Sequence, residues 1–423
     1  MSDASETGPV LAADGTPLKR SLSRALRMQK MRALALIAPL LVFVLLTFLL
    51  PIADMLFRSL ENQIVSDTLP RTVVALADWD ADSGEAPGEP VYAALAEDLQ
   101  IAAEAKMHTR VGSRLNYENP GISSLFRKAG RKVKKWDIAA DGPFRDKFLD
   151  MDDKWGDPGI WRTIQSYSPR YTNGYFLNAV DMEKTPDGPE LRPENERIYF
   201  TLFARTMFMS LIICLCCITL GYPVAWLLAN LPSRKANLLL ILVLLPFWTS
   251  LLVRTSAWKV MLQQQGVIND TLVWLGLVDD ASRLVMINNQ FGTIVAMTHI
   301  LLPFMILPMY SVMQTIPPSY LRAAKSMGAT NWTAFWRVYF PQSVPGIGAG
   351  SILVFILSIG YYITPELVGG TKGVFISNQI AFHVSTSLNW GLAAALGTIL
   401  LVVVLILYWA YDKIVGIDNV KLG

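Results

Sequence analysis

Long runs without charged side chains alternate with polar segments along this chain of 423 residues. A helix of about 20 apolar residues crosses a bilayer core, and several of these runs reach that length. Because lipid offers no hydrogen-bond partners, the backbone of such a run must be helical. The runs predict six transmembrane helices, near residues 33–57, 204–230, 236–257, 291–313, 346–364 and 391–411.

A polar region separates the first two predicted spans. Residues 53–203 contain 19 Lys or Arg and 25 Asp or Glu, and four tryptophans there can form a core. Apolar spacing predicts a helix over Val91–Lys106, and Asn173-Gly174 predicts a β-hairpin within Tyr171–Val180. We therefore expect an all-α polytopic membrane protein with a large mixed α/β insertion, residues 58–203, between helices 1 and 2. The other parts are a segment 1–32, a five-helix core 204–415 and a tail 416–423.

Within the insertion, residues 122–136 combine an apolar face with a basic one. Apolar side chains recur at helical spacing from Ile122 to Trp136, and cations fill the other face. A basic amphipathic helix can lie on anionic lipid. It can also be a solvated helix that packs on its own domain, which is the interpretation we favour. The cations are Arg127, Lys128, Arg131, Lys132, Lys134 and Lys135.

Basic residues are concentrated in alternate loops. They precede the first span and lie between spans two and three, between spans four and five, and after the last span. The opposite short loops hold only Lys259, Arg283 and Lys372. Since cytoplasmic loops carry the excess of Lys and Arg, both termini are expected in the cytoplasm and the insertion in the periplasm.

The first apolar run is too long for a signal peptide and lacks an A-x-A cleavage site, so we expect a retained span. Residues 1–18 are polar, with Gly and Pro, and are expected to be disordered. The cysteines Cys214, Cys216 and Cys217 lie inside the second predicted span, where small apolar packing residues are the favoured interpretation. No metal site, cofactor or nucleic-acid partner is expected.

The segment 317–345 is a polar island between two apolar runs. Pro317-Pro318-Ser319 can begin a short helix, with Ser319 as a possible cap, and Gly328 can end it in a left-handed conformation. Thr330 or Asn331 can cap a second short helix, which Pro341 is expected to end. Its aromatic residues share one face: Trp332, Phe335, Trp336 and Tyr339. Two short helices at an angle predict a docking surface, whereas an ordinary interfacial loop is the simpler alternative.

The spacing in this segment resembles the cytoplasmic loop of permease subunits in ATP-binding-cassette importers, E-A-A-x-x-x-G-x9-I-x-L-P. The chain has Arg322-Ala323-Ala324, then Gly328, then Val338-Tyr339-Phe340-Pro341, and every spacing matches. Arg322 in place of Glu is the main departure. Further segments resemble the spermidine/putrescine-type permeases, so that the likeness covers residues about 204–415: Pro246–Trp258, Gly266–Leu277, Ile300–Tyr310 and Thr364–Gly370.

The resemblance implies a bacterial inner-membrane permease subunit with no enzymatic activity of its own. Its expected partners are ATPase subunits, a second permease subunit of different sequence, and a periplasmic solute-binding protein. The phosphate-cradling motif of an ATPase is absent from the sequence. The residues expected to dock on the ATPase are Arg322, Ala323, Ala324, Gly328, Trp332, Trp336, Val338 and Pro341.

Ionisable or aromatic residues in or near spans are candidates for a substrate path. Arg254 can instead extend to the interface, and His299 can be a hydrogen-bonded packing residue. Glu366 can attract a cationic substrate or lie in a solvated loop. Aromatic rings can contact a cation or simply pack. The candidate path comprises Trp248, Arg254, His299, Tyr361 and Glu366.

A polyamine-like substrate follows only from the resemblance, and another small organic solute or an iron complex stays open. A stand-alone channel or secondary transporter usually carries intramembrane acids or internal repeats; these spans contain almost no acids, and the sequence shows no clear repeat. A membrane-anchored sensor needs a cytoplasmic output domain, and only about 12 residues follow the last predicted span.

Overall fold

The computed structural model describes residues 18–138, 140–185 and 188–415. The disorder expected for residues 1–18 and the expected tail 416–423 therefore lie outside the described residues, apart from Leu18, which is helical. The chain divides into two units, Met1–Arg58 and Ser59–Gly423, and each is described by itself.

The first unit is one long apolar helical segment that contains the predicted span 33–57. It consists of α1 (Leu18–Val44), a π-helical turn η1 (Leu45–Leu49) and α2 (Leu50–Arg58). The range Leu26–Arg58 is long and apolar enough to cross a membrane, and its most apolar window has no side chain buried within the chain. Such a surface requires lipid or another protein around it.

The second unit begins with a helical insertion. Its core is aromatic: Trp155 and Trp161 are fully buried, and the ring of Tyr92 lies 4.7 Å from that of Trp161. The predicted helix over Val91–Lys106 is confirmed as α5. The helices are α3 (Gln63–Thr68), α4 (Pro70–Leu76), α5 (Glu89–Glu104), α6 (His108–Asn116), α7 (Ile122–Val133), α8 (Phe144–Met151), α9 (Pro158–Ser166) and α10 (Gly174–Ala179), with 3-10 turns η2 (Asp153–Gly156) and η3 (Glu194–Glu196).

The predicted hairpin within Tyr171–Val180 is wrong. Gly174–Ala179 form α10, because Tyr175 and Ala179 lie on one helical face that packs against α21. A short antiparallel hairpin follows instead, with β1 (Met182–Thr185) paired to β2 (Gly188–Leu191). Within the described residues this is the one sheet, so the insertion is essentially helical rather than mixed α/β.

Three long helices form the centre of the membrane bundle: α11 (Tyr199–Asn230), α15 (Gln290–Gln314) and α18 (Phe340–Gly360). Glycine allows a close approach between them, since a Cβ at Gly350 would lie 2.7 Å from the sulfur of Met305. A fourth long helix, α21 (Trp390–Val415), packs on α20 (Ile376–Ser385). In this second unit, four predicted spans thus correspond to long apolar helices. Two of these helices begin earlier than expected, at Tyr199 and Asn331.

The predicted continuous span 236–257 is wrong. It is divided into α12 (Ser233–Leu244), a 3-10 turn η4 (Leu245–Trp248) and α13 (Leu251–Met261), with a bend of 93°. Pro246 cannot donate a helical hydrogen bond, and Thr249 and Ser250 have extended ψ angles. By length and composition the described residues hold five spans, or six if this bent pair counts as one.

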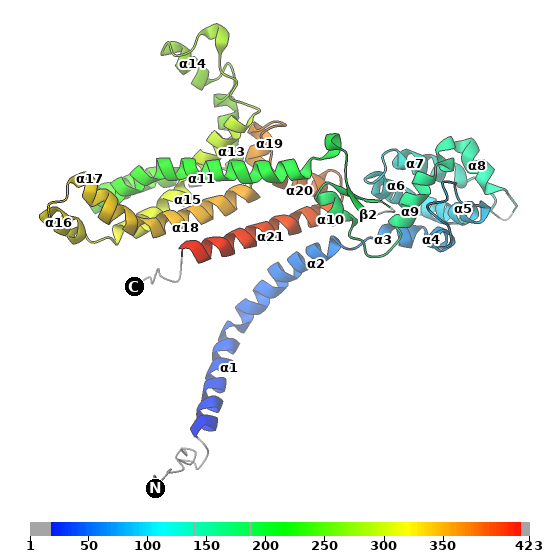
Figure 1. The fold of residues 1–423 in the computed structure, drawn as a ribbon, viewed down its shortest axis with the longest axis horizontal. Helices are drawn as coiled ribbons and strands as arrows, with labels where there is room; N and C mark the ends of the chain where they lie inside the picture. Colours follow the sequence, from blue (N-terminus) through cyan, green and yellow to red (C-terminus); the bar gives the residue numbers. More distant parts are fainter. Residues whose placement is uncertain (1–17, 139, 186–187, 416–423) are drawn as a thin grey trace. The chain divides into compact units, whose positions relative to one another are not determined.

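Short helices complete the unit. Figure 1 shows α16 and α17 at one end of the bundle and the insertion at the other. They are α14 (Val267–Trp274), η5 (Asp280–Ser282), α16 (Pro318–Ser326), α17 (Asn331–Ala334), a π-helical turn η6 (Phe335–Tyr339) and α19 (Ile363–Val368).

The insertion is attached to the bundle by specific contacts. Tyr117, directly after α6, donates its hydroxyl proton to the carbonyl oxygen of Ser387, in the loop before α21. Asp181 accepts hydrogen bonds from three amides at the start of α11, including that of Tyr199 at 3.1 Å. A carboxylate at this position is stabilised by the helix N-terminus.

Candidate docking surface and substrate path

The predicted turn between the two short helices is confirmed. Gly328 has φ +87°, and its amide donates to the carbonyl oxygen of Lys325 at 3.0 Å. Thr330 caps α17, because its hydroxyl accepts from the amide of Thr333 at 3.2 Å. Ser319, however, lies inside α16 and does not cap it: the residue before the helix is Pro317.

Pro341 does not end the second helix. Helical backbone runs without a break from Asn331 to Gly360, through the π-helical turn η6 and into α18. A π turn can absorb the loss of a regular hydrogen bond. The same order occurs at η1, which ends at Leu49, two residues before Pro51. The second short helix is therefore a direct extension of the membrane helix α18.

The aromatic stripe is present, but its ends differ in exposure. Trp332 and Trp336 lie 5.6 Å apart by ring centroid, and Phe335 stacks on Tyr339 at 5.9 Å. Trp332 is 72% exposed, whereas Tyr339 is only 3% exposed. One end of the stripe is thus anchored in the bundle, and the other end is exposed.

Exposed apolar and cationic side chains make up the docking surface, which we define as the exposed residues of 318–341. Met327 is 83% exposed, next to the exposed cations Arg322 and Lys325. Ala323 is exposed and Ala324 is buried, so only Ala323 is available to a partner. Of the other predicted residues, Trp336 and Pro341 are exposed and Val338 is half-buried.

Two breaks in helices lie close together, away from the docking surface. One lies between η4 and α13, and the other lies between α18 and α19. Thr255 and Thr364 connect them through a buried hydroxyl–hydroxyl hydrogen bond of 3.1 Å. Irregular backbone at membrane depth is tolerated where it is packed in protein or lines a cavity.

Arg254 closes the first break. Its guanidinium donates to the carbonyl oxygen of Thr249 at 3.0 Å, to the Thr249 hydroxyl at 3.3 Å and to the carbonyl oxygen of Pro246. The Pro246 carbonyl oxygen also accepts from the amide of Thr249 at 3.3 Å and from the Thr249 hydroxyl at 2.9 Å, so the turn and Arg254 together satisfy the oxygens at the break. Arg254 is therefore a cap of the broken helix rather than a side chain extended to the interface.

His299 is a hydrogen-bonded packing residue. The indole N–H of Trp258 donates to His299 Nδ1 at 3.0 Å, which joins α13 to α15. The accepting nitrogen carries no proton, so the other ring nitrogen holds the proton of the neutral imidazole.

Tyr361, Glu366 and Asn378 surround the second break. The carbonyl oxygen of Tyr361 accepts from Ser377, and that of Tyr362 accepts from Asn378 at 2.9 Å. Asn378 also donates to Glu366 Oε2 at 2.7 Å, and Glu366 remains exposed. Between residues 284 and 411 Glu366 is the one acidic residue of the sequence.

The candidate path residues are only partly brought together. Arg254, His299, Tyr361 and Glu366 lie on elements that the Trp258 and Thr255 contacts connect. Trp248 is 73% exposed, and in the described part of the chain no hydrogen bond ties it to the other four.

Comparisons with known proteins match the second half of the chain. A family described as the binding-protein-dependent transport system inner membrane component matches residues 217–415. The spermidine/putrescine transport system permease protein PotB of Salmonella typhimurium (strain LT2) is 35% identical over 222 residues, which are 52% of this chain and 77% of that relative. This chain belongs to that permease family. It is a multi-pass inner-membrane component of an ABC transporter.

The permease is also similar to other known proteins. PotB of Escherichia coli (strain K12) is 35% identical over 222 residues, 52% of this chain and 80% of that one. The inner membrane ABC transporter permease protein YdcU of the same strain is 33% identical over 257 residues, 57% of this chain and 80% of that one. A solved bacterial alginate ABC transporter in complex with its periplasmic protein is similar at 20% identity and a TM-score of 0.41, over 51% of this chain and 77% of that one.

Sequence reasoning missed several polar residues of the permease. Thr255, Trp258, Thr364 and Asn378 hold the two helix breaks together, yet each is an ordinary residue in an apolar run. Pro246 followed by Thr249-Ser250 was the available signal for the first break. Pro303 gave no such bend, since it lies within the continuous helix α15.

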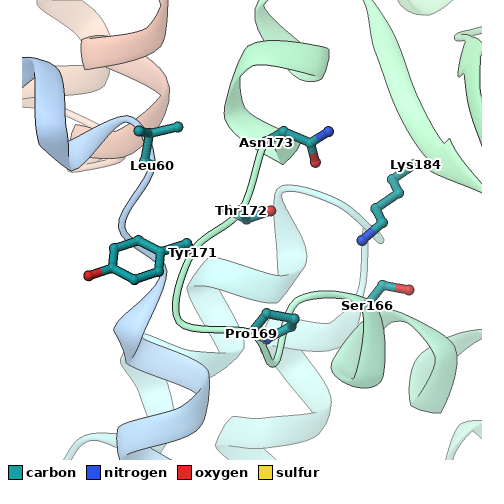
Figure 2. A pocket seen from close by; sticks show the side chains of 7 residues that line it. All are labelled: Leu60, Ser166, Pro169, Tyr171, Thr172, Asn173 and Lys184. Atoms are coloured by element: carbon teal, nitrogen blue, oxygen red, sulfur yellow. The ribbon is translucent and has the colours of Figure 1, made fainter.

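The permease also has a cavity of about 410 Å³ at the base of the insertion, beside the backbone bridge between Glu61 and Tyr171. Figure 2 shows the side chains around it, with Lys184 entering from β1. None of the predicted path residues lines this cavity, so it is separate from the path. Its lining comprises Leu60, Ser166, Pro169, Tyr171, Thr172, Asn173 and Lys184.

Proposed function

We propose that this permease is the membrane subunit of an ATP-driven importer for a small organic cation of the polyamine type. The observation that carries the proposal is the 35% identity to PotB over 77% of that relative's length. On this proposal both termini and the docking surface face the cytoplasm, and the insertion faces the periplasm.

The docking surface is the proposed contact with an ATPase subunit. An exposed tryptophan and methionine beside two cations fit an apolar groove with acidic residues at its edge. Because residues 331–360 form one helix, movement of the groove is transmitted directly to α18. ATP-driven closure of the two ATPase subunits thereby moves the membrane helices and alternates access.

A second permease subunit completes the proposed transporter. The face of α12 and α13 is strongly apolar, and Leu238 and Val253 are both 64% exposed. Broken helices line translocation paths in many transporters. We place the path between the two subunits, beside the breaks that Arg254 and Asn378 hold.

A cationic substrate is favoured by the charges at the breaks. Two of the three guanidinium nitrogens of Arg254, Nε and one terminal nitrogen, already donate to oxygens of Pro246 and Thr249 at the break. Glu366 is exposed and can pair with an ammonium group, and Tyr361 offers a ring nearby in sequence. Another organic solute or an iron complex is the second candidate.

Copurification tests the docking part of the proposal. The permease is expressed with its ATPase subunit, and the amount of ATPase retained is measured for Trp332→Ala and for the control Trp274→Ala. Trp274 serves as the control because it is also an exposed tryptophan, 83% exposed on α14, and lies outside the docking surface. We expect Trp332→Ala to lose most of the ATPase and Trp274→Ala to retain it. Equal retention by both variants argues against docking through this surface.

A further inference from the structure

Six cations on the insertion form two parallel stripes along α7 and the turn after it. Residues three and four apart on a helix are neighbours. Arg127, Arg131 and Lys134 therefore form one stripe, and Lys128, Lys132 and Lys135 form the other. We call these six residues the basic ridge. The ridge holds six of the 19 basic residues of a segment, 53–203, that has 25 acidic ones.

The apolar face of α7 is fully occupied within the insertion. Ile122, Phe126, Ala129 and Val133 are at most 1% exposed. Gly130 lies so close to α6 that a Cβ would fall 2.2 Å from the His108 ring. The helix cannot turn this face toward lipid, so the interfacial lipid-bound arrangement is excluded and the favoured packing on its own domain is confirmed. Only the charged ridge is free to meet a partner.

Internal ion pairs leave most of the ridge unneutralised. Lys128 pairs with Asp152 at 2.9 Å, and this hydrogen bond holds the pKa of Asp152 below its ordinary value. The other five cations are exposed, and none forms an ion pair with another residue that the structure describes. Like charges four residues apart destabilise a helix, by about 0.2–0.5 kcal/mol per pair. The helix C-terminus favours Arg131 and Lys132 but not Arg127.

We propose that the basic ridge is a docking surface for an acidic patch on the solute-binding protein. The family of this chain depends on such a protein, and the matched family range does not include the insertion. Charges on an exposed surface speed the encounter of two proteins and select the partner. This inference rests on the proposed function, which places the insertion on the side where the binding protein arrives.

The test uses the complete transporter in liposomes and its spermidine-loaded binding protein. ATP hydrolysis is measured against the concentration of binding protein for three forms: wild type, the ridge variant and a control. The ridge variant carries Arg127→Gln, Arg131→Gln and Lys134→Gln. The control removes three exposed cations elsewhere on the insertion, with Lys106→Gln, Arg110→Gln and Arg145→Gln.

We expect the ridge variant to need about tenfold more binding protein for half-maximal hydrolysis at low salt, with the maximal rate unchanged. The difference from wild type should shrink at high salt, because ions screen exposed charges. Identical curves for the ridge variant and the control overturn the inference. It also fails if the ridge variant changes only the dependence on anionic lipid. Wild type that no binding protein stimulates would instead refute the proposed function itself.

Discussion

Trp258 donates its indole N–H to His299 Nδ1 across 3.0 Å, and this bond ties the second half of a broken helix to the centre of the bundle. The two rings also meet edge to face, with centroids 5.4 Å apart. α13 is thereby held by three side chains: Trp258 binds α15, Thr255 binds α19, and Arg254 caps the break. The broken helix is a fixed element of the permease and not a loose loop.

Replacing Trp258 by Phe should destabilise the permease. The phenyl ring keeps part of the apolar contact, but His299 loses its donor, a change that typically costs about 1–2 kcal/mol. Thermal unfolding of the purified protein measures this. Trp274→Phe is the control, since Trp274 is exposed and makes no such bond in the described structure. Equal midpoints for the two variants would show that the Trp258 bond contributes nothing.

Gly328→Ala should uncouple transport from ATP hydrolysis. Gly328 has φ +87° with open space around it, so the added methyl group disturbs only the backbone conformation. A left-handed alanine costs about 1–2 kcal/mol, which shifts the turn toward other conformations. Spermidine uptake by cells should fall about tenfold, with the amount of membrane-inserted protein unchanged.

Gly397→Ala is the matched control for this turn. Gly397 also has open space, but it lies in the regular helix α21 without a positive φ. Uptake by the Gly397 variant should equal that of wild type. Equal uptake by both alanine variants would show that the left-handed turn at Gly328 is not needed to couple ATP hydrolysis to transport.

Glu366→Gln should weaken the use of a cationic substrate. The amide can keep the hydrogen bond with Asn378 by rotation, but the negative charge is lost. The KM for spermidine should rise about tenfold, which corresponds to about 1.4 kcal/mol. Asp279→Asn removes an acid from the loop after α14 and serves as control. A KM that is unchanged in both variants leaves Glu366 as a structural residue.

His383 should make the stability of the permease depend on pH. It accepts or donates hydrogen bonds with Tyr199 and Ser387, and burial lowers its pKa to about 4. The unfolded chain has a His pKa of about 6.5. Above that pH the contribution is fully present, and it is lost as the pH falls from about 6.5 toward 4, by about 3 kcal/mol in all.

The His383→Gln variant isolates this effect, because glutamine keeps hydrogen-bonding groups and does not titrate in this range. Unfolding midpoints at pH 7.5, 6 and 5 should fall more steeply for wild type than for the variant. Parallel curves would assign the pH dependence to other groups.

The sequence predicted the long helices and the turn at Gly328 because each has a strong local cause. Uncharged runs fix the spans, and Gly328 is the residue that tolerates the left-handed turn. The errors came from tertiary contacts that override local signals. Asn173-Gly174 favours a hairpin, yet Tyr175 and Ala179 gain burial on α21 as a helix. Pro341 is expected to stop a helix, yet the preceding π turn lets the helix continue.

The contacts of the candidate path residues were less predictable because they involve partners far apart in the chain. Arg254 could be singled out as an ionisable residue, but its role depends on the break at Pro246, and the length of the apolar run does not reveal that break. Thr255 and Thr364 are 109 positions apart, and nothing local to either indicates their hydrogen bond.

Uptake of labelled spermidine into liposomes tests the central claim most directly. The liposomes contain the permease pair and its ATPase subunits, with the binding protein outside and ATP or no nucleotide inside. We predict accumulation that requires both ATP and the ATPase subunits. Equal uptake without ATP, or by the permease alone, would contradict the account and indicate a stand-alone transporter.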